Sequence, residues 1–432
     1  MKNAILPNSP VSMLVEYDNK IRPLMFALWL TAMLPCLQAL ATWDMDGRLS
    51  PQAFALRHLS LPVLAGELLI IWIAARESIS IGDIVNRIPK IASIFLVIWI
   101  FVAIITALIE PNQRAISVFI TARYLTHGLF FAALLSLYNN APGLSTERWL
   151  QILALGAAAY VTALVIFCLI IPNREVFQWA LRIPSATNIR QIGYYVAIFT
   201  VAPLTLLLFG ADKYSWRYGL CITGLVAFIS WSGSRGALIG LIAGSLVSLV
   251  FIKKRPSRNA LLATGGYMFS GMGLSIFLPA PTPAFGIFRI LSSVQGNSDI
   301  SSGRLDVWLK TIDHIRTGPF FGHGSGRFNW NMHEAYGMDF NHPHQFILQY
   351  VYDWGMVGGA AALLSLLVLA FATLRKARDH PLAGYAAISA IITTVGIAMI
   401  DGALFYPISI MLTLALVVPL FAKASVVVGS EA

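Results

Sequence analysis

The segment "QFILQYVYDWGMVGGAAALLSLLVLAFATL", residues 345–374, decides the fold class of this chain. Asp353 is the one charged residue in this run. A helix of such length would be about 45 Å long, whereas a membrane span needs about 20 apolar residues. Gly355, Gly358 and Gly359 lie where a break is needed. We therefore expect a short helix at the membrane interface, followed by a span that begins near Met356.

The rest of the chain has the same apolar character. Hydrophobic residues make up 57% of the 432 positions and charged residues only 12%, whereas a soluble domain carries about a quarter charged residues. The chain is therefore predicted to be an all-α integral membrane protein with about twelve transmembrane helices. The first run lacks a cleavage signature and is expected to be retained. The runs lie near residues 23–43, 59–75, 91–109, 116–138, 149–172, 191–210, 217–232, 236–252, 260–279, 356–374, 385–405 and 408–423.

Charge patterning predicts the orientation. Roughly 17 of the 30 lysines and arginines fall on the side of the N-terminus, mostly in short loops, so both termini are expected in the cytoplasm. The cations on the opposite side are nearly all arginines. Either topology selection keeps lysine inside, or the outer face binds phosphate, whose oxygens match the guanidinium fork. Both explanations stay open at the level of composition.

One long polar segment, from about residue 279 to His344, is expected on the periplasmic side. Within "SGRLDVWLKTIDHIRTGPFFG", residues 302–322, apolar residues recur with helical spacing, which predicts an amphipathic helix over the membrane face. Its start would be capped by Ser301 or Ser302. The expected regions are residues 1–279 with nine spans, a loop at 280–355, and 356–432 with three spans and a cytoplasmic tail. The apolar face comprises Leu305, Trp308, Leu309 and Ile312.

Several polar residues stand where a bilayer would disfavour them. Arg123 lies near mid-span with His127 one turn further on, and a cation there costs at least about 2.5–3.5 kcal/mol. It is expected either to pair with a carboxylate such as Asp401 or to line a cavity open to the outside. Arg235 follows three serines and could form an anion site at a helix start, or belong to an ordinary loop.

Two further features lie at the outer ends of spans. Arg190 precedes Tyr194 and Tyr195, which are typical of the interfacial aromatic belt. His342 and His344 flank a proline just before the segment quoted above. A buried imidazole needs hydrogen-bond partners, so we expect the side chains of both histidines to be exposed to water.

Four pieces of sequence occur in a familiar order: "NIRQIGYY" from Asn188, "SGSRGALIGL" from Ser232, "SGRLDVW…GPFFGHGSGRF" from Ser302 and "HPHQFILQYVYDWGMVGG" from His342. Together they resemble the O-antigen ligase and polymerase superfamily over roughly residues 180–370. The family usually has His-Asn where this chain has His344 followed by glutamine. The resemblance implies a fold like that of the GT-C glycosyltransferases.

The resemblance also implies an activity. Such enzymes transfer a glycan from undecaprenyl diphosphate, at the periplasmic face of the bacterial inner membrane, to a hydroxyl on lipid A-core, a growing glycan or a protein. Membrane lipids are further expected partners; no nucleotide sugar, nucleic acid, cofactor or metal is implied. The three cysteines, each inside an apolar run, likewise predict no disulfide and no metal site.

The chemistry requires cations for the leaving diphosphate and a base for the acceptor hydroxyl. His344 matches the family's histidine and is the predicted base, with inversion by direct displacement. Arg304 could instead pair with Asp306 or Asp299. The pattern contains no pair of carboxylates of the kind that glycoside hydrolases use, so hydrolysis by that route is disfavoured. The predicted diphosphate contacts are Arg190, Arg235, Arg304 and Arg123, and the supporting candidates are His342 (alternatively a solvated neighbour), Tyr194, and Asp353 (to orient a histidine or cap the broken helix).

Other functions remain as alternatives. A transporter or flippase with about twelve spans would place binding groups at mid-membrane and often show two related halves. Here the polar content gathers in one loop, and the two halves show no repeat, which favours an enzyme. "HPHQ" does not have the zinc-protease spacing. Between ligase and polymerase, the long loop and the arginine-rich outer face favour the ligase.

Overall fold

The computed structural model describes residues 10–43, 56–77, 88–109, 113–141, 143–171, 177–211, 215–278, 286 and 303–422, with helices and no strand in these ranges. Of residues 10–20, 180 and 181 only the backbone is described. The helices are α1 (Pro10–Ala41), α3 (Leu61–Arg76), α5 (Lys90–Ile109), α6 (Arg114–Asn140), α7 (Thr146–Ile170), α8 (Trp179–Arg182), α9 (Ile189–Phe209), α10 (Ser215–Trp231), α11 (Arg235–Phe251), α12 (Arg258–Leu274), η1 (Ser275–Phe277), α14 (Arg304–Ile315), α15 (Phe328–Tyr336), α16 (Phe346–Ala377), α17 (Pro381–Ala398), η2 (Ala403–Phe405) and α18 (Pro407–Phe421).

The predicted fold class, an all-α membrane protein, is confirmed. Each of the twelve predicted runs overlaps one of these helices. Within the described ranges, eight helices are long and apolar enough to cross a membrane, and α11 and α18 are shorter apolar helices. The number of twelve spans stays a prediction, as do the limits of the three regions.

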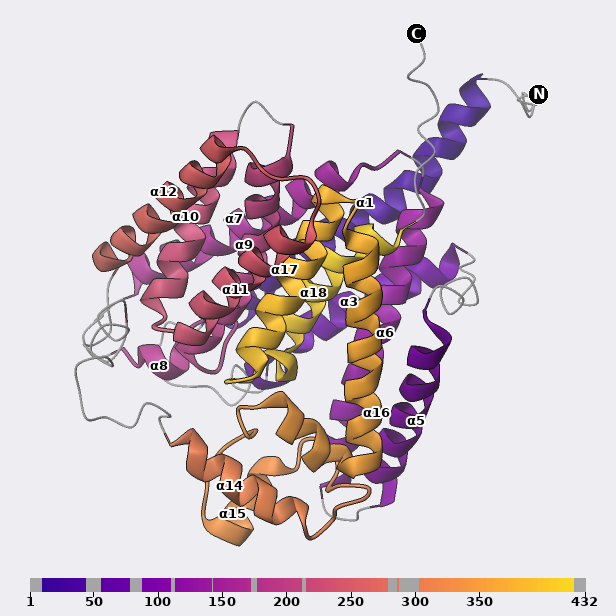
Figure 1. Ribbon diagram of the computed structural model, residues 1–432, viewed down its shortest axis with the longest axis vertical. Helices are drawn as coiled ribbons and strands as arrows, with labels where there is room; N and C mark the ends of the chain where they lie inside the picture. The colour runs from indigo at the N-terminus through magenta and orange to yellow at the C-terminus, as the bar shows by residue number, and fades with distance from the viewer. Residues whose placement is uncertain are drawn as a thin grey trace.

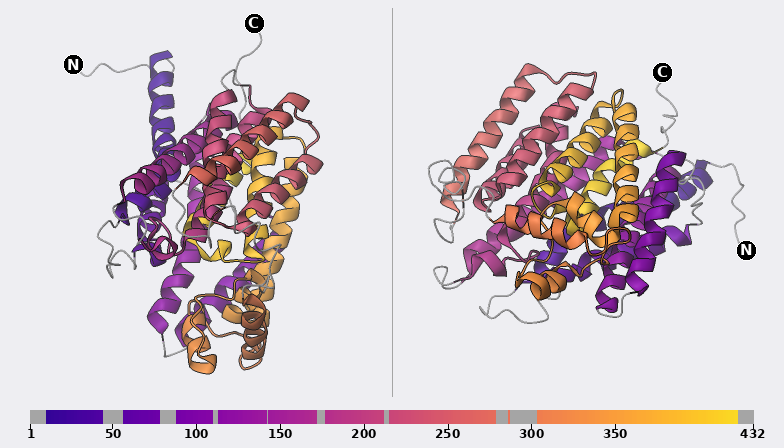
Figure 2. Two further views of the ribbon diagram at one scale, coloured as in Figure 1. Left: turned by 90° about the vertical axis from the view of Figure 1, so that its left-hand side faces the viewer. Right: turned by 60° about the horizontal axis from the view of Figure 1, so that its bottom comes forward.

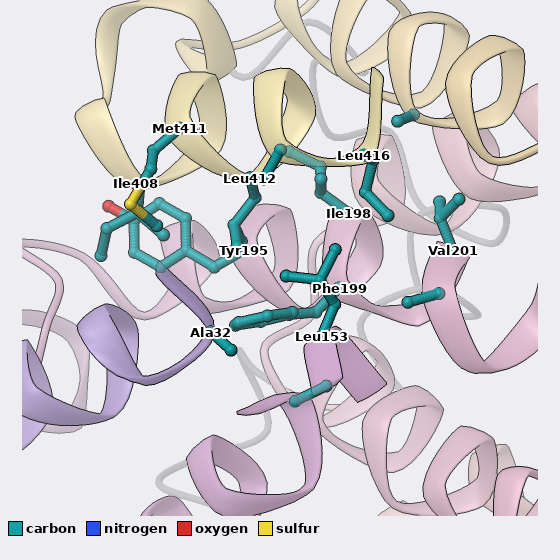
Figure 3. Packing of buried hydrophobic residues seen from close by; sticks show 14 of the residues in the cluster. Ala32, Leu153, Tyr195, Ile198, Phe199, Val201, Ile408, Met411, Leu412 and Leu416 are labelled. Atoms are coloured by element: carbon teal, nitrogen blue, oxygen red, sulfur yellow. The ribbon is translucent and has the colours of Figure 1, made fainter. Parts of the chain in front are cut away.

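Helix α9 forms the centre of the bundle. All its side chains except Arg190 are buried, and it packs against α7, α10, α11, α17 and α18. Figure 3 shows Ile198 and Phe199 of α9 close to Leu153 of α7 and Leu412 of α18. Bilayer helices associate through close packing rather than hydrophobic transfer, so a fully enclosed helix is a rigid support. The polar N-terminal end of α9 is thereby fixed in place.

The loop helices lie at one end of the molecule. Figures 1 and 2 show α14 and α15 together there, whereas α1 begins and α18 ends at the opposite end. Helix α14 confirms the predicted loop helix. It begins after Gly303, whose φ is 80°, and Ser301 and Ser302 lie outside the described residues. Its buried positions are Val307 and Thr311, whereas three residues of the predicted apolar face are exposed: Leu305, Leu309 and Ile312.

The predicted break in the long segment is confirmed. Helix α16 leaves helical geometry at Gly355, where φ is 65° and ψ is −172°. The glycine-rich loop, residues 318–326, docks on this kink: the amide of Met356 donates to Pro319 O (2.8 Å) and that of His323 to Tyr352 O (2.9 Å). A Cβ at Gly355 would collide with the carbonyl of Phe320, so only glycine fits here. The loop and the following span are thus joined as one unit.

Candidate active site

A strained turn presents the two histidines. The backbone of His344 is left-handed, with a φ of 57°, which costs a non-glycine residue about 1–3 kcal/mol. Two contacts hold this turn: the amide of His344 donates to Nδ1 of His342 (3.1 Å), and the indole of Trp308 in α14 donates to Pro343 O (2.8 Å). Strain of this size persists where surrounding contacts enforce it, which is typical of functional sites.

His344 is oriented by a carboxylate. Its Nδ1 lies 2.8 Å from Oδ1 of Asp401, which follows α17. A carboxylate only accepts hydrogen bonds, so Nδ1 carries the proton and Nε2 carries the lone pair. Nε2 has no hydrogen-bond partner within the described ranges, and the side chain is 25% exposed. This is the arrangement of a general base held by an orienting acid.

Asp401 is held from several sides. Its Oδ2 accepts from Nη2 of Arg304 (2.8 Å), and its Oδ1 also accepts from the amide of Gly402 (3.0 Å). The hydroxyl of Tyr194 in α9 provides another hydrogen bond. Burial by itself raises the pKa of this carboxyl, but the hydrogen bond and charge of His344, together with Arg304, outweigh it and hold the pKa well below its usual range. Asp401 is therefore ionised at neutral pH.

His342 is buried, so the expectation that both histidines are wet, and the alternative of a solvated neighbour, are wrong for this residue. It is 3% exposed, and its Nε2 lies 3.1 Å from the hydroxyl of Tyr406. Burial, and then the charges of His344 and Arg304, lower its pKa well below the ordinary value, although Asp401 opposes them. A neutral His342 with its lone pair on Nδ1 can accept from the amide of His344.

Two of the predicted arginines border this centre without being engaged. Arg190 lies one turn before Tyr194 on α9, and Arg235 begins α11. The starts of these helices touch, because a Cβ on Gly193 would lie 2.6 Å from Ser232 Oγ, and one on Gly236 would lie 2.9 Å from Ile400, next to Asp401. Within the described ranges neither guanidinium has a hydrogen-bond or ion-pair partner.

The other two arginines are already engaged. Arg123 is 2% exposed and donates from Nη2 to Phe405 O (2.9 Å), so it does not form the expected pair with Asp401 and it is not open to the outside. Arg304 binds Asp401 rather than Asp306, whose oxygen lies 3.0 Å from Lys310 Nζ. Asp299, the other partner considered for Arg304, lies outside the described residues.

Two supporting candidates differ from expectation. Tyr194 and Tyr195 are buried in the core, so the aromatic-belt interpretation is wrong; Tyr194 contacts Asp401 instead. Asp353 accepts from the amide of Gln349 at 2.9 and 2.8 Å and contacts no histidine within the described ranges. The orienting role considered for Asp353 is therefore taken by Asp401.

One group of side chains in the described residues could hold a metal ion: His342, His344 and Asp401, whose ligand atoms lie within 4.8 Å of one another. Their lone pairs do not converge on one point, however. Nδ1 of His342 accepts from a backbone amide, Nδ1 of His344 carries a proton, and Asp401 already faces Arg304. The residues therefore fit a hydrogen-bonded base better than a cation site. A cleft of about 10 Å³ beside them has room for about one water.

One family of known proteins is similar to the region that holds this centre. Residues 220–363 match the family model described as O-antigen ligase. This segment is similar to the O-antigen ligase family. It covers one third of the chain, includes Arg235, Arg304 and His344, and confirms the resemblance to the superfamily. At the level of the family, the match supports a membrane glycosyltransferase of the O-antigen ligase and polymerase type.

One relative of the chain gives no information about its activity. An uncharacterized protein of Haemophilus influenzae is 24% identical over 281 residues, which cover 59% of this chain. The alignment spans 66% of that protein's own length, just under two thirds.

The sequence does not predict two residues of this centre, Asp401 and Tyr406. Asp401 is predicted only as a possible partner of Arg123, and Tyr406 is not predicted to have any role. One signal was present, because Asp401 is the sole charged residue in the otherwise apolar "AMIDGALFYP", residues 398–407. An acid in such a run needs a partner or a task. Which cation or imidazole would meet it depends on the tertiary fold.

Proposed function

We propose that the chain transfers a glycan from undecaprenyl diphosphate to an acceptor hydroxyl at the periplasmic face of the bacterial inner membrane, with lipid A-core as the acceptor. It would then be an O-antigen ligase. The observation that carries the proposal is the 2.8 Å contact between His344 and Asp401, which leaves Nε2 of His344 free at a partly exposed position. Oxygen nucleophiles need such a base near neutral pH.

The proposed reaction is a single displacement. The acceptor oxygen attacks the anomeric carbon and transfers its proton to Nε2 of His344, while the bond from that carbon to the phosphate oxygen breaks. The electron pair of that bond leaves with undecaprenyl diphosphate, and the anomeric configuration inverts. Asp401 stabilises the imidazolium that forms, as the acid of a hydrolase triad does. No cofactor or nucleotide sugar takes part.

The leaving diphosphate gains negative charge, which preorganised cations stabilise. Arg190 and Arg235 suit this role, because their guanidinium groups are unengaged within the described ranges and they stand at the starts of two helices that meet beside Ile400, the neighbour of Asp401. Arg304 keeps further N–H donors beyond the one on Asp401, so it could contact phosphate as well. Arg123 is the weakest of the four predicted contacts, and through Phe405 O it would act as a positioning residue.

Two alternative functions differ from this proposal: a polymerase would use another acceptor, and a flippase would catalyse no reaction. A polymerase of the same superfamily would use the same donor and base but elongate a glycan. A flippase would need binding groups at mid-membrane in broken helices. The break in α16 instead lies against the glycine-rich loop, at the end that holds His344, which favours an enzyme.

Deleting the gene in its native bacterium tests the proposal. The surface glycolipid and the lipid-linked pool would be compared by gel electrophoresis. Bare lipid A-core, with long polymer accumulating on the carrier lipid, is the expected result. Core that bears a single repeat unit would instead indicate a polymerase. Normal surface glycolipid with loss of another polysaccharide would overturn the ligase proposal.

A further inference from the structure

A second cavity, of about 350 Å³, lies in the loop region away from His344. His314 in its wall is ten residues along α14 from Arg304, or about 15 Å along the helix axis. A cavity of this size falls in the range of small-molecule sites, about 300–1,000 Å³. Its walls come from the turn between α5 and α6, the end of α14, the glycine-rich loop and α15. The lining residues are Gln113, His314, Thr317, His323, Arg327, Trp330, Asn331, Glu334 and Ala335.

Aromatic rings form part of its wall. The rings of His314 and His323 lie 4.5 Å apart, and Tyr352 packs behind His323 with ring centres 4.8 Å apart. Trp330, by contrast, is 53% exposed although it lines the cavity. An exposed indole ring offers a flat apolar face on which another flat apolar surface can stack. The C–H face of a pyranose ring is such a surface.

The remaining groups suit hydroxyls rather than phosphate. Asn331 donates to the hydroxyl of Tyr352 (2.8 Å), which leaves its amide oxygen without a partner within the described ranges. Arg327 and Glu334 bring opposite charges, so the lining has no net charge beyond the histidines. Burial lowers the pKa of His314 and His323, and these imidazoles are therefore largely neutral at pH 7. A carboxylate in the wall would repel a diphosphate.

We propose that this cavity is a glycan subsite, in which Trp330 stacks on a pyranose ring while Asn331 and Glu334 hydrogen-bond its hydroxyls. The inference rests on the proposed function only for the source of the sugar. Because its wall at His314 lies about 15 Å along α14 from Arg304, which binds Asp401, the subsite would hold a sugar several units from the bond being made. That sugar belongs either to the donor glycan or to the core oligosaccharide of the acceptor.

The test measures sugar binding separately from transfer. Full-length protein in lipid nanodiscs would be titrated with two probes, each released by mild acid: the glycan of the lipid-linked pool and the core oligosaccharide. Saturation-transfer NMR would report binding to the wild type, Trp330→Ala and Trp330→Phe. Trp216→Ala is a matched control, because Trp216 is equally exposed, at 52%, but starts α10 at the opposite end of the bundle.

We expect one probe to bind the wild type and Trp216→Ala equally, and to bind Trp330→Ala about tenfold more weakly, with recovery in Trp330→Phe. The probe that responds identifies the donor or the acceptor as the source. In transfer assays, Trp330→Ala should raise the KM for that substrate with little change in kcat. Equal binding of both probes to Trp330→Ala and wild type, or no binding to the wild type, overturns the subsite. Failure of the proposed function would appear elsewhere, as normal surface glycolipid after deletion of the gene.

Discussion

Two imidazole–carboxylate pairs have the same contact distance and different surroundings. Nδ1 of His344 lies 2.8 Å from Asp401 Oδ1, and Nδ1 of His127 lies 2.8 Å from Glu67 Oε1, between α6 and α3. The side chains of the first pair are 25% and 11% exposed, those of the second 3% and 0%. Nε2 of His127 and Oε2 of Glu67 are buried without a hydrogen-bond partner in the described ranges.

The difference shows that access and supporting contacts, rather than the pair itself, separate a reacting group from a structural one. Asp401 has Arg304, Tyr194 and a backbone amide to keep it ionised, and its histidine reaches solvent. Within the described ranges Glu67 forms one side-chain hydrogen bond, to His127, and that histidine is buried. The first pair is suited to move a proton to and from substrate, whereas the second is suited to join α3 to α6.

The largest expected effect is that of His344→Ala. General bases contribute about 10²–10⁴-fold to rate, so transfer should fall by about 10³-fold, while the amount of protein in the membrane stays unchanged. Transfer from purified lipid-linked glycan in proteoliposomes measures this. His333→Ala is the control, because His333 pairs with Asp339 at 2.8 Å but both side chains are more than 60% exposed. Full activity in the His344 variant would contradict the assignment of His344 as the base.

Asp401→Asn should have the next largest effect. The amide keeps the shape but can no longer stabilise an imidazolium, so transfer should fall by about 10²-fold or more. Arg304 would also lose its counter-charge, and the thermal midpoint should decrease. Asp353→Asn serves as the comparison, since Asp353 contacts Gln349 and not a histidine. An equal loss of rate in both variants would contradict the orienting role of Asp401.

The buried pair should respond in stability instead. Glu67→Gln keeps an acceptor oxygen for His127 but removes the negative charge of the pair, which should cost about 1–3 kcal/mol of unfolding free energy, between the values for hydrogen bonds between bilayer helices and for broken buried pairs. Replacing both residues by leucine should restore most of that loss. Thermal unfolding in nanodiscs measures both, and transfer per folded molecule should not change. A large loss of rate at full stability would show that the second pair takes part in the reaction.

The sequence predicted the fold well, because its signals are local. Apolar runs mark each helix, and Gly355 marks the kink, since only glycine adopts that backbone without strain. The face on which α14 packs was not predicted, because helical spacing identifies an apolar stripe but not what covers it. Leu305 and Leu309 are exposed, whereas Val307 and Thr311 are buried.

The candidate site was predicted only in part, because only some of its residues have a local signal in the sequence. His344 was found through a resemblance that covers its own segment. Its partner Asp401 is 57 residues away, and Arg304 is 97 residues from Asp401. Contacts over such separations depend on how α14, α16 and α17 pack, which no local pattern encodes. Arg123 illustrates the converse, since its need for a partner was recognised but the backbone carbonyl of Phe405 supplies it.

A smaller effect is expected for Arg235→Lys. Lysine keeps the charge but loses the fork that matches phosphate oxygens, so the KM for the lipid-linked donor should rise about tenfold. Arg123→Lys should instead lower stability, because Arg123 is buried against Phe405. Donor titrations and thermal unfolding of both variants separate these outcomes. Unchanged donor affinity in Arg235→Lys would remove Arg235 from the proposed diphosphate contacts.

The smallest expected effect is the pH dependence of stability. It should come from His342, beside His344 and Asp401, and not from the buried pair of His127 and Glu67. The pKa of His342 in the folded protein is well below its ordinary value of about 6.5, because burial disfavours its charged form. The unfolded chain therefore binds a proton that the folded chain does not, and stability falls as pH drops below about 6.5. A single such site loses at most about 1.4 kcal/mol per pH unit.

Unfolding measured between pH 7.5 and 5.5 tests this loss. His342→Gln should flatten the slope by up to the contribution of one proton, since the amide does not titrate. Glu67→Gln should lower stability at every pH without removing the His342 contribution. If the slope persisted unchanged in His342→Gln, another group would be responsible for it. His342 accepts the amide of His344 only while its Nδ1 is unprotonated, so the lowered pKa keeps the strained turn in place while stability falls below about pH 6.5.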